Sequence, residues 1–152
     1  MRISAKGEYA AKAVLYLSFK HPEVVTIQDI AQQHSIPVKY LEHILLTLKK
    51  AGLLQSRRGV KGGYQLAKPP DQISVGQVLA TVDGKFSQAG CSEEVATGEY
   101  TCPEIESCGL KAVWRDVQNA VEGILFGTTF DEVKKRTLAG VVRKSDYLMY
   151  EI

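Results

Sequence analysis

The sequence contains no hydrophobic run approaching the roughly 20 residues that a membrane-spanning helix requires. Nor does it contain a Gly-rich phosphate loop of the Walker type, a setting of paired carboxylates, or a motif that pairs its three histidines with a nucleophile. We therefore expect neither a membrane protein nor an enzyme. Lys12 interrupts the one candidate core of a signal peptide, so we expect a cytoplasmic chain.

Cysteine is scarce, and all three cysteines lie in one loop-like stretch, at Cys91, Cys102 and Cys108. An odd number of cysteines cannot all pair in disulfides. In a reducing cytoplasm, clustered thiols bind metals or undergo redox chemistry more often than they form structural disulfides. The stretch is therefore a candidate sensor.

Positive charge is concentrated in the first half of the chain. Residues 1–70 hold eleven Lys and Arg against four acidic residues, a balance of +7, whereas residues 71–152 hold eight against thirteen, a balance of −5. Such an asymmetry indicates a polyanionic partner for the first half.

The first half also has the pattern of a helix-turn-helix. Helices are predicted over 3–18, 27–33 and from Pro37 to about Ala51, where Gly52 ends the third. Ser4 and Thr26 are the expected N-caps. The predicted buried stripe of the third helix comprises Val38, Leu41, Ile44, Leu45 and Leu48.

A basic β-hairpin is predicted directly after the third helix. Strands over 53–58 and 64–67 flank a glycine-rich reversal at 59–63. Arg57, Arg58 and Lys61 lie at or near its tip, as in the wing of a winged helix.

Early residues of the second helix in such a motif reach base edges in the major groove. The corresponding residues are Lys39, Tyr40, Glu42 and His43. Lys39 suits a guanine or a phosphate, and Glu42 can accept a hydrogen bond from cytosine. Arg57 and Arg58 suit a narrow minor groove.

The second half is predicted to carry a long amphipathic helix over 110–125, suited to pairing with a second copy on a pseudopalindromic operator. A short helix near 129–136 and a tail without strong periodicity follow it. The predicted fold is mainly α with a small β wing. The expected divisions are 1–83 for DNA binding, 84–108 for the sensor loop, 109–136 for the dimerisation helix and the short helix, and 137–152 for the C-terminal tail.

Several stretches match one family in combination: Arg2–Ala10, Ile36–Glu42, Arg58–Tyr64, Ile73–Val78 and Trp114–Asp116. Over nearly its full length the chain resembles the winged-helix transcriptional regulators of the IscR, NsrR and CymR type. The resemblance implies a homodimer crossed through the long helix, double-stranded operator DNA contacted by the third helix and the wing, and often an iron–sulfur cluster held by three cysteines.

The fourth ligand of such a cluster, and its 2Fe–2S or 4Fe–4S type, are left open. Members of the IscR kind have a His three residues after the third cysteine, where this chain has Lys111. Members of the NsrR kind use an acidic residue in the partner's first helix, and the matching residue is Glu8. A zinc site is disfavoured because neither gap has the C-x2-C form. A metal-free thiol switch, or control by an effector or partner protein, is the alternative.

Overall fold

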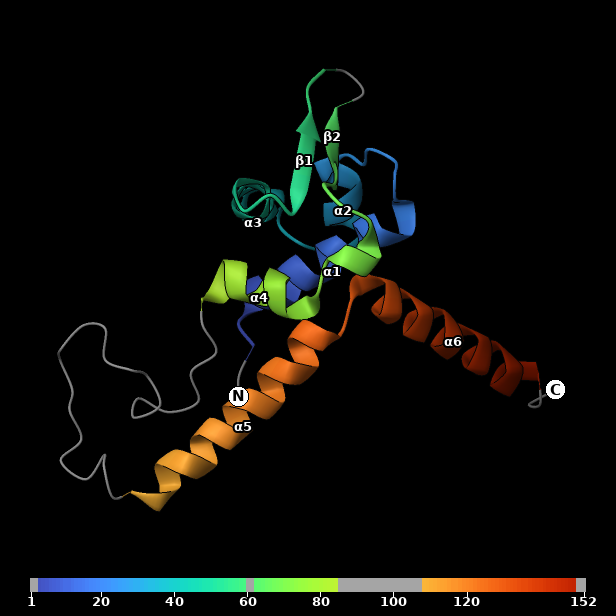
Figure 1. Cartoon of the computed structure of the whole chain (residues 1–152). Coiled ribbons are helices and arrows are strands. Elements are labelled where there is room, and N and C mark those ends of the chain that lie inside the picture. Colours follow the sequence, from blue (N-terminus) through green and yellow to red (C-terminus); the bar gives the residue numbers. More distant parts are fainter. Residues whose placement is uncertain (1–2, 60–61, 85–107, 150–152) are drawn as a thin grey trace.

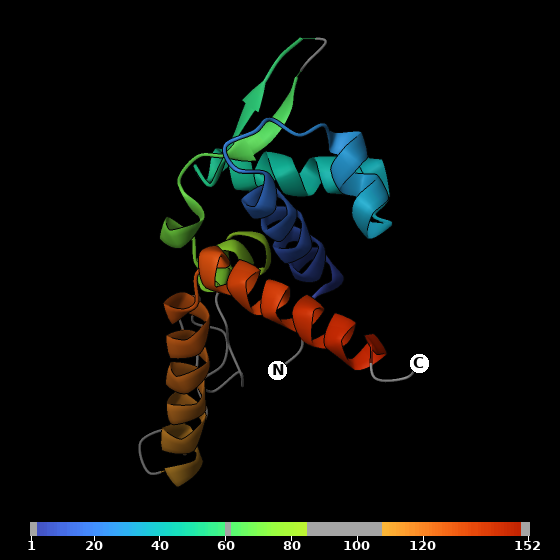
Figure 2. The ribbon, with the colours of Figure 1, turned by 90° about the vertical axis from the view of Figure 1, so that its right-hand side faces the viewer.

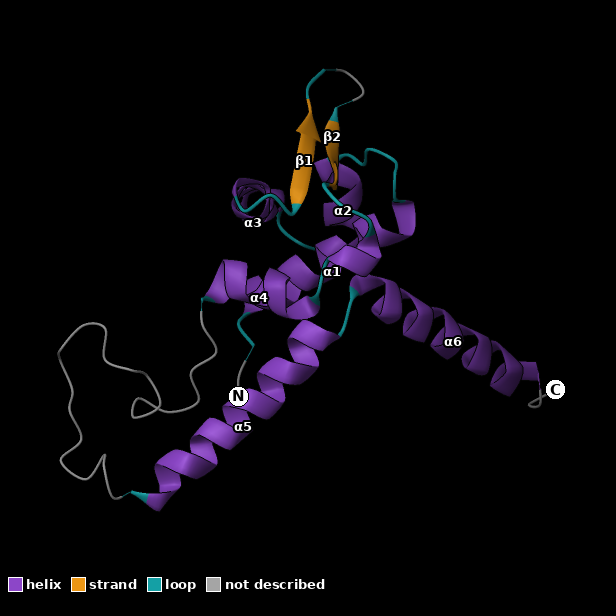
Figure 3. Cartoon of the chain, viewed as in Figure 1, coloured by secondary structure: helices purple, strands orange, loops and turns teal. Residues whose placement is uncertain are grey.

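The computed structural model describes residues 3–59, 62–84 and 108–149, with side chains up to residue 141. The fold is mainly helical with one small antiparallel sheet, as predicted (Figures 1 and 3). None of the helices in these ranges is long and apolar enough to cross a membrane. In chain order the elements are α1 (Ala5–Lys20), α2 (Ile27–His34), α3 (Val38–Lys50), β1 (Leu54–Arg57), β2 (Gly63–Leu66), the 3-10 turn η1 (Pro70–Gln72), α4 (Val75–Asp83), α5 (Gly109–Gly127) and α6 (Phe130–Met149).

Helix α1 lies at the centre of the head, which we define as α1 to α4 with the two strands. The Ser4 hydroxyl caps α1 by accepting a hydrogen bond from the Gly7 N–H at 2.9 Å. Ala10 and Ala13 are fully buried, and such small side chains let neighbouring helices approach closely. The apolar stripe of α3 packs into the same core, where each fully buried leucine or isoleucine contributes roughly 1.5–3 kcal/mol.

A three-residue turn at 35–37 joins α2 to α3 and confirms the helix-turn-helix. Ser35 ends α2 with a left-handed backbone at φ 53°, a conformation that suits a helix C-terminus. The N–H of buried Ile36 then donates to the Ala31 carbonyl at 3.0 Å. Pro37 is the N-cap of α3 and not its first residue as predicted.

The stripe of α3 was predicted correctly except at its first residue. Leu41, Ile44, Leu45 and Leu48 are buried, whereas Val38 is 42% exposed. Successive residues turn by about 100° around a helix, so Val38 lies at the edge of the arc that the four buried side chains share. The prediction that Val38 belongs to the core was therefore wrong.

The two strands form a wing that is attached to the start of α2. Leu54 pairs with Leu66 and Arg57 with Gly63 in an antiparallel register. Beside this ladder, Val25 and Tyr64 exchange two backbone hydrogen bonds of 2.9 and 2.8 Å. A β-carbon at Gly63 would lie 2.6 Å from the Val25 carbonyl carbon, so this close approach requires glycine.

A short backbone pairing joins α5 to the head. The Val75 N–H donates to the Thr128 carbonyl, and the Phe130 N–H donates to the Ile73 carbonyl, both at 2.9 Å. The Phe130 side chain is 1% exposed within the core. The Phe126 ring lies over Gly76, where a β-carbon would come within 2.6 Å of it. One end of α5 is therefore fixed, and the helix projects away from the head (Figures 1 and 2).

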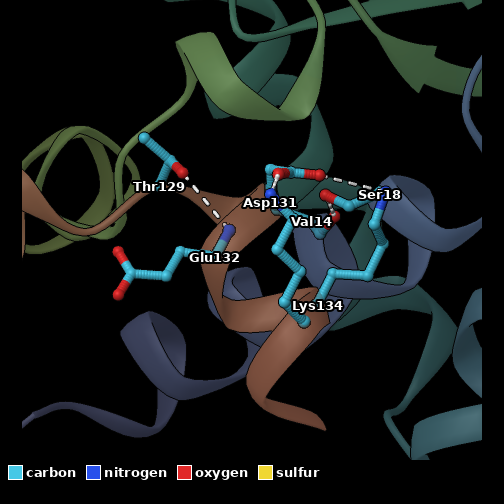
Figure 4. A network of polar contacts seen from close by, with 7 residues as sticks. Val14, Ser18, Thr129, Asp131, Glu132 and Lys134 are labelled. Atoms are coloured by element: carbon cyan, nitrogen blue, oxygen red, sulfur yellow. Dashed lines mark hydrogen bonds and ion pairs between the residues drawn. The ribbon is translucent and has the colours of Figure 1, made fainter. Parts of the chain in front are cut away.

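Helix α6 is longer than predicted. The Thr129 hydroxyl caps it by accepting a hydrogen bond from the Glu132 N–H, and Asp131 forms an ion pair with Lys134 beside α1 (Figure 4). The helix was expected to end near Arg136 but continues to Met149, where a tail was predicted. Its first turns carry acidic residues followed by lysines one turn later, a spacing that stabilises a helix independently of core burial.

Candidate nucleic-acid interface

The solvent-facing side of α3 carries the side chains predicted to reach base edges. Lys39, Glu42 and His43 are all exposed. The buried stripe on the opposite side holds the helix against α1, so these three side chains point away from the core. A cation, a carboxylate and an imidazole on two turns of one helix can together donate to and accept from base edges.

Tyr40 is placed differently from the other three predicted residues. Its ring is 40% exposed, and it meets the Tyr9 ring of α1 edge-on, with ring centroids 5.8 Å apart. Edge-to-face aromatic pairs of this kind contribute about 0.5–1.5 kcal/mol beyond the area that they bury. Tyr40 therefore helps to hold α3 on α1 as well as presenting part of its surface to solvent.

The carboxylate of Glu42 lies toward the wing. Burial raises the pKa of the Tyr64 hydroxyl above its usual value, and the negative charge of Glu42 raises that pKa further. Since Tyr64 belongs to β2, this electrostatic effect shows that the Glu42 row of α3 and the base of the wing border the same space.

The wing presents exposed cations beyond this space. Arg57 ends β1 and Arg58 follows it, both exposed. Gly59 turns the chain with φ 111°, and its carbonyl accepts a hydrogen bond from the Gly62 N–H at 2.8 Å. Lys61 lies outside the described residues.

These cations have no acidic partners of their own. Within the described residues, the ion pairs are confined to α1 and α6, and none involves Lys39, Arg57 or Arg58. Lys49 and Lys50, at the end of α3, are likewise exposed and have no ion-pair partner within that part of the chain. The surface formed by α3 and the wing therefore carries uncompensated positive charge, as phosphate binding requires.

The predicted metal ligands are only partly described. Cys91 and Cys102 lie outside the described residues. Cys108 is the N-cap of α5 at the end remote from the head, half-buried and not in a disulfide. Among the described residues, no group of three or more His, Cys, Asp or Glu side chains could hold a metal ion.

Glu8 lies in the first turns of α1, exposed to solvent. Its carboxylate accepts a hydrogen bond and forms an ion pair with Lys12 one turn later, at 2.6 Å. Nearby, α1 is joined to the end of α4: the Ser4 hydroxyl donates to Asp83 at 2.5 Å, and Lys6 donates to the Val82 carbonyl at 2.8 Å. Glu8 and Cys108 of one chain thus lie on separate parts of the molecule, the head and the free end of α5 (Figure 1).

Two features of this surface were missed by reasoning from the sequence. The exposed aliphatic side chains of Val38 and Leu46 lie on α3 among the polar residues. Leu46 falls outside the predicted stripe, and that departure from the helical period could have identified it. The half-buried His34, whose ring meets Tyr16 edge-on, had no counterpart in any pattern.

A helix-turn-helix whose second helix is exposed, followed by a basic β-hairpin, defines the chain as a winged-helix DNA-binding protein. Its sequence matches over residues 3–136 the family described as "Rrf2: Iron-dependent Transcriptional regulator". The chain belongs to the Rrf2 family of transcriptional regulators, which bind DNA and are not enzymes.

Individual members of the family are similar over most of the chain. The HTH-type transcriptional regulator IscR of Aliivibrio salmonicida is 34% identical over 134 residues, covering 88% of this chain and 77% of that protein. The structure of CymR, the global cysteine regulator of B. subtilis, superposes with a TM-score of 0.73 at 29% identity, over 90% of this chain and 98% of the other. T. potens IscR superposes with a TM-score of 0.71 at 28% identity, over 90% and 88%.

Proposed function

We propose that this protein is a cytoplasmic, homodimeric transcriptional regulator whose binding to a pseudopalindromic operator is controlled by an iron–sulfur cluster held by Cys91, Cys102 and Cys108. The observation that carries the proposal is α5, an unburied amphipathic helix with one of these cysteines at its free end. The family description, which names iron dependence, supports the same conclusion.

The homodimer is supported by the exposure of α5. None of its residues is buried, and its apolar stripe faces solvent, with Leu110 61% and Ile124 69% exposed. A contiguous apolar face of this kind is characteristic of an interaction surface. A second copy of α5 would cover it with the same side chains, as a two-fold interface requires.

The donor set suits an iron–sulfur cluster, since thiolates are its usual ligands and an oxygen ligand can complete the set. Glu8 is the proposed fourth ligand, supplied by the partner subunit. Within one chain α5 rises about 1.5 Å per residue over 19 residues, so Cys108 lies about 28 Å from the junction with the head. A crossing of two such helices would bring each free end toward the other subunit's α1. The cluster would supply a redox-active group whose loss or change alters the dimer.

The metal-free alternative also has an observation in its favour. The structural neighbour with a TM-score of 0.73 is described as a global cysteine regulator, and the same protein from Staphylococcus aureus has been solved in an oxidized form. In this alternative, oxidation of a thiol, an effector or a partner protein controls a repressor of the same fold.

Anaerobic purification distinguishes the two functions. The cluster-bearing protein should show visible absorption, with iron and acid-labile sulfide in matching amounts. Cys91→Ala, Cys102→Ala and Cys108→Ala should each abolish them. Retention of iron and sulfide in all three variants would contradict the ligand assignment, and metal-free protein whose operator affinity responds to oxidant would support the thiol switch.

Glu8→Ala should bind the cluster but lose it faster to oxygen and chelators, because one ligand is removed while the thiolates stay. Glu23→Ala is the matched control, since Glu23 is exposed on the loop after α1. The measurement is the rate of loss of visible absorption in air. Equal rates in the two variants would remove Glu8 from the site.

A further inference from the structure

Two large aliphatic side chains face solvent on α3, the helix that faces DNA in the proposed function. Val38 and Leu46 are each 42% exposed. Together with Glu42 they recur at every fourth residue, so the three side chains form one row along the helix. Eight residues separate the two aliphatic side chains, which corresponds to about 12 Å along the axis.

The surroundings of this row indicate which partner it meets. Lys39 is exposed beside Val38, and Lys49 and Lys50 are exposed beyond Leu46. Arg57 and Arg58 lie on the wing, on the side toward which Glu42 acts electrostatically on Tyr64. An apolar protein surface that docked here would have to cover unpaired cations at a high desolvation cost. A polyanion satisfies them.

Double-stranded DNA combines such a polyanion with an apolar group in its major groove, the C5-methyl group of thymine. The methyl group distinguishes thymine from the other bases and is contacted by aliphatic side chains on helices that enter the groove. Aliphatic side chains exposed on the groove-facing side of α3 therefore have a chemically matched ligand.

We propose that Val38 and Leu46 read thymine methyl groups, so that each half-site requires thymines at two positions. With base pairs spaced 3.4 Å apart, the separation of about 12 Å corresponds to roughly three or four base pairs. Val38, in the first turn of α3, reads one thymine, and Leu46 reads the other. This inference rests on the proposed function, because it assumes that α3 enters the major groove of an operator.

Replacement of thymine by deoxyuridine tests the inference, since it removes only the methyl group. The operator is first selected from a random duplex library with the full-length protein. Each thymine of one half-site is then replaced singly, and affinity is measured at fixed salt. Loss of one buried methyl group should weaken binding about four-fold at two positions.

The variants assign each position to a side chain. Val38→Ala should bind about four-fold more weakly per half-site and become insensitive to uracil at one position, and Leu46→Ala should do the same at the other. Val141→Ala and Leu138→Ala are the matched controls, because both side chains are exposed on α6. Circular dichroism confirms that all four variants are folded.

Three results would overturn the inference. A selected operator whose affinity is unchanged by every uracil replacement would show that no methyl group is read. Uracil sensitivity that persists in both α3 variants would show that other side chains read it. A protein that selects no sequence would overturn the proposed function together with the inference, whereas the first two results would leave the proposed function intact.

Discussion

Gly63→Ala is expected to detach the wing from the start of α2. A β-carbon at this position would lie against the Val25 carbonyl oxygen, 2.6 Å from the carbonyl carbon and 3.1 Å from the Thr26 nitrogen. These are backbone atoms, so no change of rotamer can relieve the overlap. Either β2 or the segment around Val25 has to move.

The expected loss can be worked out from the contacts involved. Val25 and Tyr64 exchange two backbone hydrogen bonds, each of which contributes about 1 kcal/mol net. Forcing extra volume into a close-packed position costs a further 1–3 kcal/mol or so. We expect the free energy of unfolding to fall by roughly 2–4 kcal/mol, a large share of the 5–15 kcal/mol typical of a folded domain.

Urea unfolding measures this loss. Gly140→Ala is the matched control, because the space around Gly140 on α6 is open and alanine is the better helix former. Operator binding should weaken in Gly63→Ala, since Arg57 and Arg58 move with the wing. If Gly63→Ala unfolds at the urea concentration of the wild-type protein with the same slope, the attachment of the wing through Val25 contributes nothing and the reasoning is refuted.

Two further predictions concern charge. Arg58→Ala should weaken operator binding and lower the slope of affinity against salt by about one per contact, whereas Arg136→Ala, which removes a cation paired with Glu132 on α6, should leave both unchanged. Equal slopes in the two variants would exclude a phosphate contact by Arg58. Burial and the charge of Lys12 lower the pKa of His34, so stability from its neutral ring is present above the unfolded value of 6.5 and lost as the pH falls through the folded value. The urea midpoint should therefore decrease on acidification, less steeply in His34→Gln than in a control variant of exposed His43, and identical profiles would contradict the assignment.

Local features of the fold could be predicted from the sequence because their causes lie within a few residues. The caps formed by Ser4, Thr26 and Ser74 each depend on one hydroxyl and an N–H three residues later. Helix periodicity and the turn at 35–37 likewise follow from neighbouring residues. The exposure of the predicted base-contacting side chains on α3 followed from the same periodicity.

Features that depend on distant segments could not be predicted. Nothing near Val25 indicates that it pairs with Tyr64, and nothing near Phe130 indicates that it is buried beside Ile73. Val38 has the residue type of a core position, and only the packing of α3 reveals that it faces solvent. The ligand assignment of Cys91 and Cys102 stays a prediction, because both lie outside the described residues.

The junction between the head and α5 makes that helix a lever arm. Its fulcrum is the short pairing of 73–75 with 128–130, together with the Phe126 ring that rests on Gly76. Over a length of about 28 Å, a tilt of roughly 10° at this fulcrum displaces the tip at Cys108 by about 5 Å. That displacement exceeds the spacing of one base pair, so a few backbone contacts determine how precisely two heads can be held at a set distance.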